Sequence, residues 1–426
     1  MDGPEWRLAA EPYNAVVQRV AVRPAMSGPL NGWPVAVKDL IDVAGLPTRC
    51  GSAVLADAAP AQQDAAVVAR LRAAGAVVVA KTHTHEFAYG PTGDVSVDGP
   101  CHNPHDPQRI TGGSSSGSAA AVAAGLVPLA LGTDTGCSTR TPAALCGVVG
   151  LKPAHGALPT AGVFPLSETL DHIGLLGADV STVAVAFSAL TGHRIDPTAP
   201  VDGTVVGRPT DPYWRVYDPE ITAAVDRAAA ALEAAGAILR DVSLPGIEEL
   251  AATYYVIVDA EAYATHARWL AQRPGDYQPV TAARLQAAAR HTAADYVAAQ
   301  RTRRRLTTEL TGRLHTAGVD LLLLPTTPLR ATPIGAEQVQ APDGTQVAVR
   351  PALLSLTLPF NLLGWPALSV PAPGATGLPA GIQVAGVLGG EQAVLAAGAR
   401  IAAGWRPFRY AGPIRDTPAP GRRRPP

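Results

Sequence analysis

Three segments of the chain carry residue types that make little sense as plain structure and could take part in catalysis. The first is Gly-Trp-Pro-Val-Ala-Val-Lys-Asp at residues 32–39, an apolar run that delivers a lysine at its end. Strand residues that are buried on both faces rarely lead into a lysine without a reason. On this segment alone, the simpler interpretation is that Lys38 reaches solvent at the strand end.

The second segment is Thr-Gly-Gly-Ser-Ser-Ser-Gly-Ser at residues 111–118, followed by an alanine-rich run to Ala124. A flexible Gly/Ser linker is disfavoured because the run opens directly into a helix-forming, core-like stretch. Consecutive backbone N–H groups at a helix start make a site for negative charge. A phosphate-binding loop would end in Gly-Lys-Ser or Gly-Lys-Thr, and this segment does not.

The third segment is Gly-Thr-Asp-Thr-Gly-Cys-Ser-Thr-Arg-Thr-Pro at residues 132–142, directly after the strand-like run 127–131. A tight turn of small residues lets backbone N–H groups converge on one point, which an oxyanion hole requires. Asp134 and Arg140 are spaced to pair across this turn. A polar, salt-bridged loop without a catalytic role remains an alternative for this segment taken alone.

In this order, the three segments resemble the amidase signature family, and the match runs over roughly residues 28–403. Four further stretches support it: Asp64 with Leu-Arg-Ala-Ala-Gly-Ala at 71–76, Gly-Val-Val-Gly-Leu-Lys-Pro at 147–153, Leu-Pro-Thr-Thr-Pro at 324–328 and Asn-Leu-Leu-Gly-Trp-Pro-Ala at 361–367. The resemblance implies a hydrolase that cleaves a carboxamide C–N bond through an acyl-enzyme. It carries the family's lysine over to Lys38, its bridging serine to Ser114 and its nucleophile to Ser138.

The same resemblance assigns the remaining site residues. It implies an oxyanion hole made by the backbone N–H groups of Thr135, Gly136, Cys137 and Ser138, with Ser115, Asp134 and Arg140 as supports. Lys38 must be neutral to remove a proton from serine, and holding an ordinary lysine neutral at pH 7 costs about 4.6 kcal/mol. Burial among apolar strand residues would lower its pKa, and Ser114 can relay a proton between Lys38 and Ser138.

The sequence departs from the family pattern at Cys137, where the oxyanion turn usually carries a second glycine. If this position needs a positive φ, a side chain there costs on the order of 1 kcal/mol. Ser116 also replaces a common glycine, which is similar to the allophanate hydrolases. Only about 30 residues precede the strand of Lys38, so the N-terminal helices of many relatives are mostly missing, and a homodimer is an open expectation.

Other interpretations remain for the same residues. Residues 113–117 match the Gly-x-Ser-x-Gly elbow of α/β-hydrolases, with Ser115 as nucleophile, but the preceding residues 101–110 are too polar for its strand. A nucleophilic Cys137 is a further alternative. His83, His85 and Glu86, with Cys101 and His102 nearby, could suggest a metal site; the stretch 81–90 instead fits a family segment that binds no metal.

Two alternatives concern the whole chain. A degenerate scaffold protein is disfavoured because all three catalytic positions are filled. The amidase subunit of a tRNA amidotransferase would need partner subunits, and we find no glutamine-binding pattern between residues 247 and 362. Allophanate hydrolase is a second rival, although its usual extra C-terminal domain is not found.

The elements that must position these residues follow a β-α-β rhythm. Asp64 can cap a helix over 65–74, a β-branched strand follows at 77–79, and a second helix runs from Asp218-Pro219 to Gly236. Residues 247–317 are mostly helical, and 196–212 is expected to be a surface loop. We therefore predict an α/β protein with the amidase signature fold, a large mixed and mainly parallel central sheet covered by helices on both faces. One domain spans 1–415, and 416–426 is a disordered Pro/Arg-rich tail.

Composition limits the classes of partner. The 426 residues are 47% hydrophobic with a formal net charge of −1, so neither nucleic acid nor membrane is expected as a partner. The four cysteines show no CxxC or metal-ligand spacing, and the sequence predicts neither cofactor nor metal. No signal peptide or membrane span is predicted, which indicates a cytoplasmic protein. The expected partner is a small amide, bound by walls at 161–166 and 254–263 whose apolar and aromatic residues favour an aryl or alkyl group.

Overall fold

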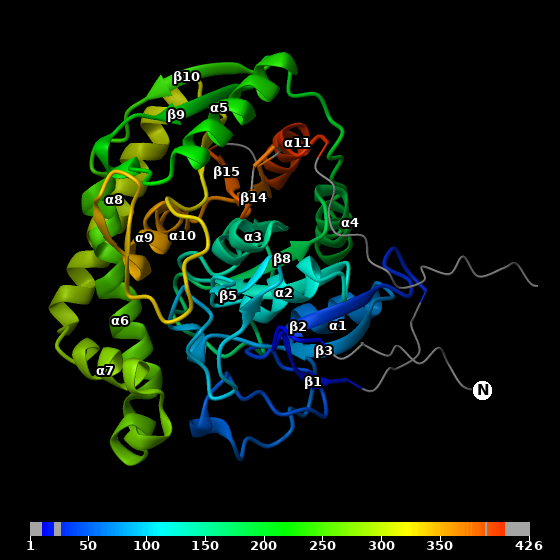
Figure 1. The fold of residues 1–426 in the computed structure, drawn as a ribbon, viewed down its shortest axis with the longest axis vertical. Helices are drawn as coiled ribbons and strands as arrows, with labels where there is room; N and C mark the ends of the chain where they lie inside the picture. Colours follow the sequence, from blue (N-terminus) through cyan, green and yellow to red (C-terminus); the bar gives the residue numbers. More distant parts are fainter. Residues whose placement is uncertain (1–10, 21–26, 373, 376, 388–389, 405–426) are drawn as a thin grey trace, which may run out of the picture.

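An eleven-stranded sheet runs through the molecule (Figure 1). The computed structural model describes residues 11–20, 27–372, 374–375, 377–387 and 390–404. From one edge to the other, the strands are β1 (Val16–Arg19), β3 (Val77–Thr82), β2 (Pro34–Lys38), β6 (Leu129–Asp134), β8 (His172–Gly177), β7 (Val149–Lys152), β14 (Ala367–Pro371), β15 (Gly381–Gly386), β11 (Leu321–Pro325), β9 (Val205–Pro209) and β10 (Ile238–Val242).

The sheet is large and mixed, as predicted. Strands β3, β2 and β6 are parallel to one another, and so are β11, β9 and β10. The other six neighbouring pairs are antiparallel, so parallel pairs do not predominate and this detail of the prediction is corrected. Each parallel pair follows a helical crossover, whereas β14 leads directly into β15, and a direct connection returns the chain antiparallel.

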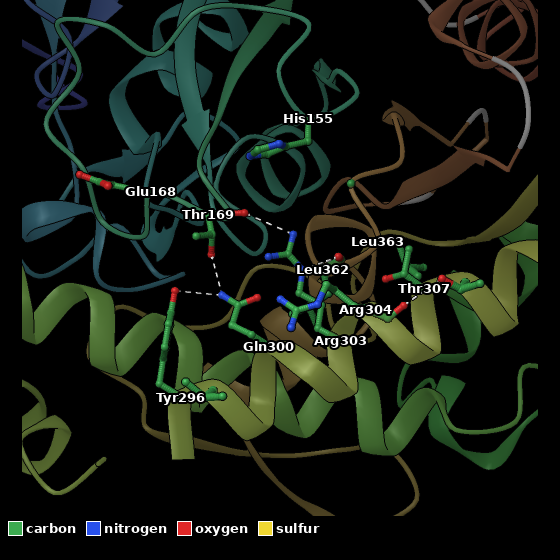
Figure 2. A pocket seen from close by; sticks show the side chains of 13 residues that line it. His155, Glu168, Thr169, Tyr296, Gln300, Arg303, Arg304, Thr307, Leu362 and Leu363 are labelled. Atoms are coloured by element: carbon green, nitrogen blue, oxygen red, sulfur yellow. Dashed lines mark hydrogen bonds between the residues drawn. The ribbon is translucent and has the colours of Figure 1, made fainter. Parts of the chain in front are cut away.

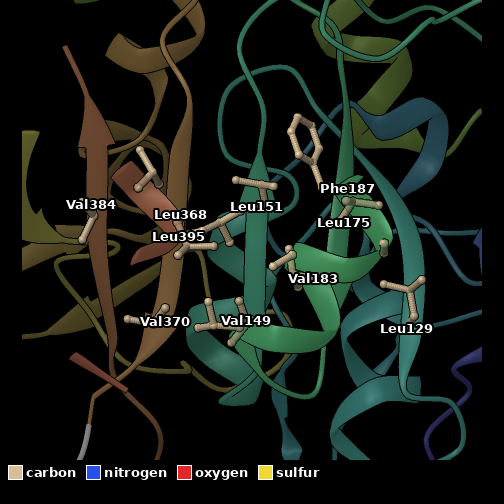
Figure 3. Close-up of a cluster of buried hydrophobic side chains, with 14 of the residues drawn as sticks. Leu129, Val149, Leu151, Leu175, Val183, Phe187, Leu368, Val370, Val384 and Leu395 are labelled. Carbon is tan, nitrogen blue, oxygen red and sulfur yellow. The ribbon is translucent and has the colours of Figure 1, made fainter. Parts of the chain in front are cut away.

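Four helices cover one face of the sheet: α1 (Ala66–Ala73), α4 (Val180–Thr191), α5 (Pro219–Ala234) and α11 (Glu391–Ile401). Alternate strand residues point toward them, because successive side chains of a strand lie on opposite faces. Figure 3 shows Leu129, Val149 and Leu368 from three strands lying against Val183 of α4 and Leu395 of α11. All of these side chains are buried, and they belong to the largest hydrophobic cluster of the described residues.

The opposite face is covered by α2 (Ser116–Ala123) and α3 (Arg140–Cys146), which consist mostly of small residues and are buried throughout. Close packing explains the small residues: a Cβ added at Gly150 of β7 would lie 2.6 Å from the Cβ of Ala143 in α3. These two helices begin at the second and third segments singled out in the sequence. Their positions therefore depend on close contact with the sheet.

A group of helices lies along one side of the molecule, away from α1 and α4 (Figure 1). It consists of α6 (Ile247–Gln272), α7 (Pro279–Ala288), α8 (Ala293–Thr316), α9 (Val349–Ser355) and α10 (Leu358–Leu362). Helix α6 contacts α7, α8 and α10 and carries the buried aromatic Tyr254 toward the turn that follows β6. The prediction that 247–317 is mostly helical is confirmed.

The remaining elements are short. Two-stranded sheets are formed by β4 (His102–Asn103) with β5 (Asp106–Ile110) and by β12 (Gln338–Gln340) with β13 (Gln346–Ala348), and 3₁₀ turns lie at η1 (Ala53–Leu55), η2 (Glu86–Ala88), η3 (Pro212–Trp214) and η4 (Pro274–Asp276). Among the helices of the described ranges, none has both the length and the apolar character needed to cross a membrane. The predicted tail at 416–426 lies outside the described residues.

Three local predictions can be compared with the structure. Asp218 caps α5 as predicted, accepting from the Glu220 N–H at 3.0 Å. Asp64 does not cap α1; it accepts from the Ala44 N–H at 2.8 Å and pairs with Arg72 Nε at 3.0 Å. The loop predicted for 196–212 is also wrong, because it contains β9, which lies between two neighbouring strands.

Candidate active site

Lys38 ends β2 with its side chain fully buried. Its Nζ lies 2.6 Å from Ser114 Oγ and 2.7 Å from Thr133 Oγ1, and donates to both hydroxyls. Burial lowers the pKa of Lys38 from 10.5 to about 7, against the opposing effect of the Asp134 and Asp171 carboxylates. The simpler interpretation, that Lys38 reaches solvent, is therefore wrong.

Ser114 lies in the loop before α2 and follows a cis peptide bond from Gly113. The loop passes through a tight space: a Cβ at Gly113 would lie 2.8 Å from the Gly93 backbone nitrogen. The Ser114 carbonyl accepts from the His85 N–H at 3.1 Å, which fixes the backbone on its other side. Ser114 is thus held with its hydroxyl against the lysine amine.

Ser115 joins this loop to the next strand rather than facing a pocket. Its hydroxyl donates to the Thr133 carbonyl at 3.1 Å and accepts from the Thr133 N–H at 3.2 Å. Its own N–H donates to the Ser138 carbonyl at 3.1 Å. The side chain is fully buried, which disfavours the α/β-hydrolase alternative because a nucleophilic elbow exposes its serine.

Ser138 lies in the turn between β6 and α3 and lines a small cavity. Within the described ranges, no hydrogen bond joins Ser138 Oγ to Ser114 Oγ. The backbone N–H groups of Thr135, Gly136, Cys137 and Ser138 likewise have no hydrogen-bond acceptor there. Four unpaired donors in one turn can stabilise a negatively charged oxygen.

Cys137 fits the turn without strain. Its φ is not in the left-handed region, so the position does not require glycine, and the cost considered for a positive φ does not arise. Burial raises the pKa of the thiol to about 12, with a further contribution from Asp134. A thiol that stays neutral is a poor nucleophile, which disfavours Cys137 as the attacking group.

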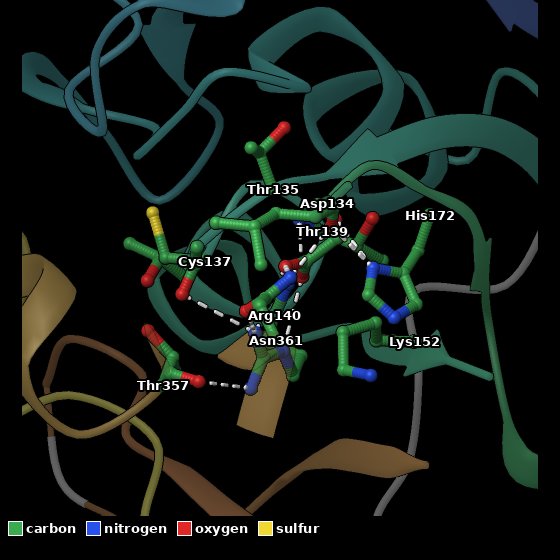
Figure 4. Close-up of polar contacts among 12 residues, drawn as sticks. Asp134, Thr135, Cys137, Thr139, Arg140, Lys152, His172, Thr357 and Asn361 are labelled. Atoms are coloured by element: carbon green, nitrogen blue, oxygen red, sulfur yellow. Dashed lines mark hydrogen bonds and ion pairs between the residues drawn. The ribbon is translucent and has the colours of Figure 1, made fainter. Parts of the chain in front are cut away.

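A buried network lies beneath the turn (Figure 4). Arg140 pairs with Asp134 through Nη2–Oδ1 at 2.8 Å and Nε–Oδ2 at 3.0 Å, and both side chains are fully buried. Arg140 also donates to Asn361 Oδ1, Gln383 Oε1 and the Thr357 carbonyl at 2.6 to 2.9 Å. Burial opposes ionisation of Asp134, yet Arg140 outweighs it and holds the pKa of that carboxyl below its usual range.

Sequence reasoning missed several members of the site. The Asp171 carboxylate accepts from the Thr135 hydroxyl at 2.5 Å and from the N–H groups of Leu166 and Ser167 at 2.9 and 3.1 Å. Burial raises its pKa to about 6. Asp171 thereby connects the turn after β6 to the loop that contains Leu166 and Ser167. No motif in the sequence around residue 171 pointed to Asp171. Asn361, in contrast, is the first residue of the stretch 361–367, which supports the family resemblance.

The cavity beside Ser138 has mixed walls. They include Leu166 and, from α6, Tyr254, Tyr255 and Val258, where sequence reasoning expected them. A Cβ at Gly136 would collide with the Tyr254 hydroxyl, so α6 packs closely on the turn. Two charged residues, Asp259 and Arg350, also line the cavity. The prediction of apolar and aromatic walls is therefore corrected: Asp259 lies within the predicted range 254–263, and Arg350 comes from α9, far along the chain.

The histidine cluster near 83–86 is engaged in protein contacts. His83 Nδ1 lies 2.8 Å from Ser116 Oγ and its Nε2 lies 2.8 Å from the Gly99 carbonyl. Glu86 Oε1 accepts from the Ser52 hydroxyl at 2.6 Å. Across the described part of the chain, no group of three His, Cys, Asp or Glu side chains could hold a metal ion.

A wide groove elsewhere on the surface contains none of the predicted site residues (Figure 2). It lies between α8 and two loops, and its polar groups bond to one another. Gln300 Nε2 donates to Thr169 Oγ1 at 3.2 Å, and Arg303 Nε donates to the Leu362 carbonyl at 2.7 Å. The groove therefore differs from the cavity of Ser138, where donors are left unpaired.

The chain is similar to known proteins over most of its length. The family model "Amidase" matches residues 11–395. AtzE of Pseudomonas sp. (strain ADP), which belongs to a 1-carboxybiuret hydrolase, is 38% identical over 387 residues, 87% of this chain and 83% of that protein. A glutamyl-tRNA(Gln) amidotransferase subunit from Symbiobacterium thermophilum is 38% identical over 398 residues, covering 84% of this chain and 80% of its own length.

Solved structures agree. A crystal structure described as an amidase has a TM-score of 0.83 and 39% identity, and the match covers 92% of both chains. The structure of 6-aminohexanoate cyclic dimer hydrolase complexed with substrate has a TM-score of 0.82 and 29% identity, over 94% of this chain and 92% of that one.

Proposed function

The chain belongs to the amidase signature family, and from that premise we propose that it hydrolyses the C–N bond of a small carboxamide through an acyl-enzyme on Ser138. Lys38 and Ser114 complete the catalytic group in this proposal, and the leaving group is ammonia or an amine. The observation that carries it is a buried amine 2.6 Å from the Ser114 hydroxyl, beside a turn of four unpaired N–H groups.

Acylation begins with proton removal. With a pKa of about 7, Lys38 is about half neutral at pH 7. It takes the proton of the Ser114 hydroxyl, which takes the proton of Ser138 as Ser138 Oγ bonds to the carbonyl carbon. The carbonyl oxygen becomes an oxyanion, which the N–H groups of the turn stabilise.

Collapse of the tetrahedral intermediate breaks the C–N bond and leaves the acyl group on Ser138. The proton held by Lys38 returns through Ser114 to the departing nitrogen, so the amine leaves neutral. A water molecule then attacks the ester carbon, and its proton follows the same relay. The carboxylic acid is released, and Ser138 recovers its hydroxyl.

Two alternatives make different predictions. An amidotransferase component, the activity in the name of one relative, would require partner subunits for its full reaction. A degenerate scaffold would release no ammonia from any amide. The isolated chain should be active alone under our proposal, and the relative with a cyclic-dimer substrate makes cyclic as well as linear amides worth testing.

The test is a panel of linear and cyclic amides, assayed for ammonia or amine release by the purified chain. We expect activity that disappears in Ser138→Ala and is retained in Ser243→Ala, a change at an exposed serine. If the folded chain turned over no amide of the panel, the proposed function would be wrong.

The nucleophile can be identified separately. A fluorophosphonate should label Ser138, because the adduct resembles the tetrahedral intermediate. Trypsin releases Ile110–Arg140 as one peptide carrying Ser114, Ser115, Cys137 and Ser138, so fragmentation must locate the label. Label on Ser115 would favour the α/β-hydrolase alternative, and label on Cys137 would indicate a thiol enzyme.

A further inference from the structure

Arg350, in the first turn of α9, lines the same cavity as Ser138. Its Nε is buried and has no hydrogen-bond partner. Within the described residues, no carboxylate lies within ion-pair distance of its guanidinium. Its Cζ lies 5.9 Å from the centroid of the Tyr89 ring. That distance is at the outer limit of a cation–π contact.

An unpaired guanidinium in such a position is unfavourable for the protein alone. Arginine stays protonated in proteins and presents five N–H donors, and a buried donor without a partner costs stability. A second cation, Arg284, lies nearby and donates to the Tyr89 carbonyl at 2.8 Å. Burial lowers the pKa of Arg284 to about 10, and the charge of Arg350 contributes to that shift. The carboxylates of Asp94 and Asp259 act on Arg284 in the opposite direction.

The carboxylate of the cavity wall, Asp259, bonds to groups other than Arg350. Asp259 accepts a short hydrogen bond from the Tyr89 hydroxyl, and its Oδ2 lies 3.5 Å from His291 Nε2. It forms no ion pair with Arg350. Because the described part of the chain supplies no partner, the group that suits Arg350 is an anionic group on the molecule that enters the cavity.

We propose that Arg350 binds a carboxylate of the substrate, so that this enzyme prefers amides that carry a second, anionic group. This inference rests on the proposed amidase function and specifies its substrate class. A planar guanidinium binds a carboxylate through two parallel hydrogen bonds, while Leu166, Tyr254 and Val258 offer apolar surface to the methylene groups between the carboxylate and the amide. The carboxylate replaces the aryl or alkyl end that the sequence favoured.

The test compares matched amides. Succinamate, glutaramate and adipamate carry the carboxylate on the acyl half, and N-acetylglycine carries it on the amine half; the uncharged controls are butanamide, pentanamide, hexanamide and N-ethylacetamide. We expect kcat/KM of the wild-type enzyme to be at least tenfold higher for one carboxylated compound than for its control, as a hydrogen bond to a charged group can provide. The series that shows this preference identifies the half that Arg350 contacts.

Substitutions then assign the preference to this residue. Arg350→Met should lower the ratio of the two kcat/KM values by at least tenfold, and Arg350→Lys should retain part of it. Arg350→Glu should favour amides with an ammonium group instead. Arg305→Met is the matched control, since Arg305 pairs with Glu249 at the surface, and it should leave the ratio unchanged.

Two outcomes would overturn the inference: equal or better turnover of the uncharged amides by the wild-type enzyme, or a ratio unaffected in Arg350→Met. If no amide is turned over, the proposed function fails, and binding to Ser138→Ala decides the role of Arg350 separately. Glutaramate should then bind at least tenfold more tightly than pentanamide by calorimetry, and equal binding would exclude carboxylate recognition.

Discussion

Lys38 and Cys137 show how burial sets the chemistry of single residues in this site. Burial disfavours the charged form of any ionisable group. For Lys38 it produces a neutral amine near pH 7, which can accept a proton, and for Cys137 it produces a neutral thiol, which reacts poorly. Burial therefore makes Lys38 a better base and Cys137 a poorer nucleophile.

The pH profile tests the role of Lys38. Because the lysine must lose its proton to act, kcat/KM should rise with pH, with a midpoint near pH 7, and level off on the alkaline side. Lys38→Ala should lose most of its activity at neutral pH with an unchanged circular dichroism spectrum. Near wild-type turnover in this variant, or a flat profile between pH 5 and 9, would contradict the assignment.

Lys38 should also make stability depend on pH. Its pKa is lower in the folded than in the unfolded chain, so between about pH 7 and 10.5 the unfolded state binds more protons. Stability of the wild type relative to Lys38→Met should therefore rise across this range, by about 5 kcal/mol, and stay level below pH 7. Urea denaturation of both proteins at several pH values measures this difference. A difference that is constant with pH would mean that Lys38 is charged in the folded state.

Cys137 should contribute its N–H group and not its thiol. Cys137→Gly retains that donor, so activity should stay within about tenfold, whereas loss of an oxyanion donor costs ~10²–10³ in kcat. Gly136→Ala is the contrasting variant: its methyl group would meet the Tyr254 hydroxyl, so it should lose more activity than Cys137→Gly. Complete inactivity of a folded Cys137→Gly would reveal a chemical role for the thiol.

At the scale of elements, the turn between β6 and α3 is held by residues from other parts of the chain. Asp171 lies just before β8, Thr357 and Asn361 lie in and beside α10, and Gln383 lies in β15. The Asp134–Arg140 pair is the centre of these contacts. A buried pair is weak evidence for stability, but removal of one partner leaves a charge without compensation.

Arg140→Met should therefore destabilise the protein by about 3–5 kcal/mol, because the Asp134 carboxylate remains buried. The matched control is Arg208→Met, which breaks the exposed 2.9 Å pair with Asp241 and should cost less than about 1 kcal/mol. Urea unfolding at pH 7 measures both. If Arg140→Met does not fold, Asn361→Ala should still show a loss of about 1–3 kcal/mol. Equal effects of the buried and the exposed change would contradict this account.

At the scale of the whole molecule, the central sheet connects the hydrophobic clusters that pack on its two faces. Leu321 and Leu323 of β11 lie in the cluster under α5 and α11, whereas Leu322 and Leu324 belong to the cluster of α6 and its neighbours. Because β11 contributes side chains to both clusters, unfolding of one cluster removes packing contacts from the other. This coupling is why we propose that residues 1–415 form one domain.

Unfolding should therefore be a single transition. Far-ultraviolet circular dichroism, which follows all helices, and fluorescence of tryptophans such as Trp214 and Trp365, which are buried in the cluster of α6, should give coincident urea curves. An earlier transition in fluorescence alone would indicate that residues 247–317 and their neighbours unfold as a separate unit.

The sequence by itself determined the local features of this protein. Lys38, Ser114 and Ser138 could be assigned because three short segments, in this order along the chain, resemble the amidase signature family. The helical crossovers could be predicted from apolar periodicity and from caps such as Asp218, since these depend on residues within one or two turns.

The tertiary structure alone decided which distant segments meet. Strand β9 was mistaken for a loop because it owes its burial to β10 and β11 on either side. The roles of Thr133, Asp171 and Gln383, and the position of Arg350 beside Ser138, follow from the order of strands in the sheet. Sequence spacing carries no information on that order, because it results from packing between elements that lie from 36 to 243 residues apart.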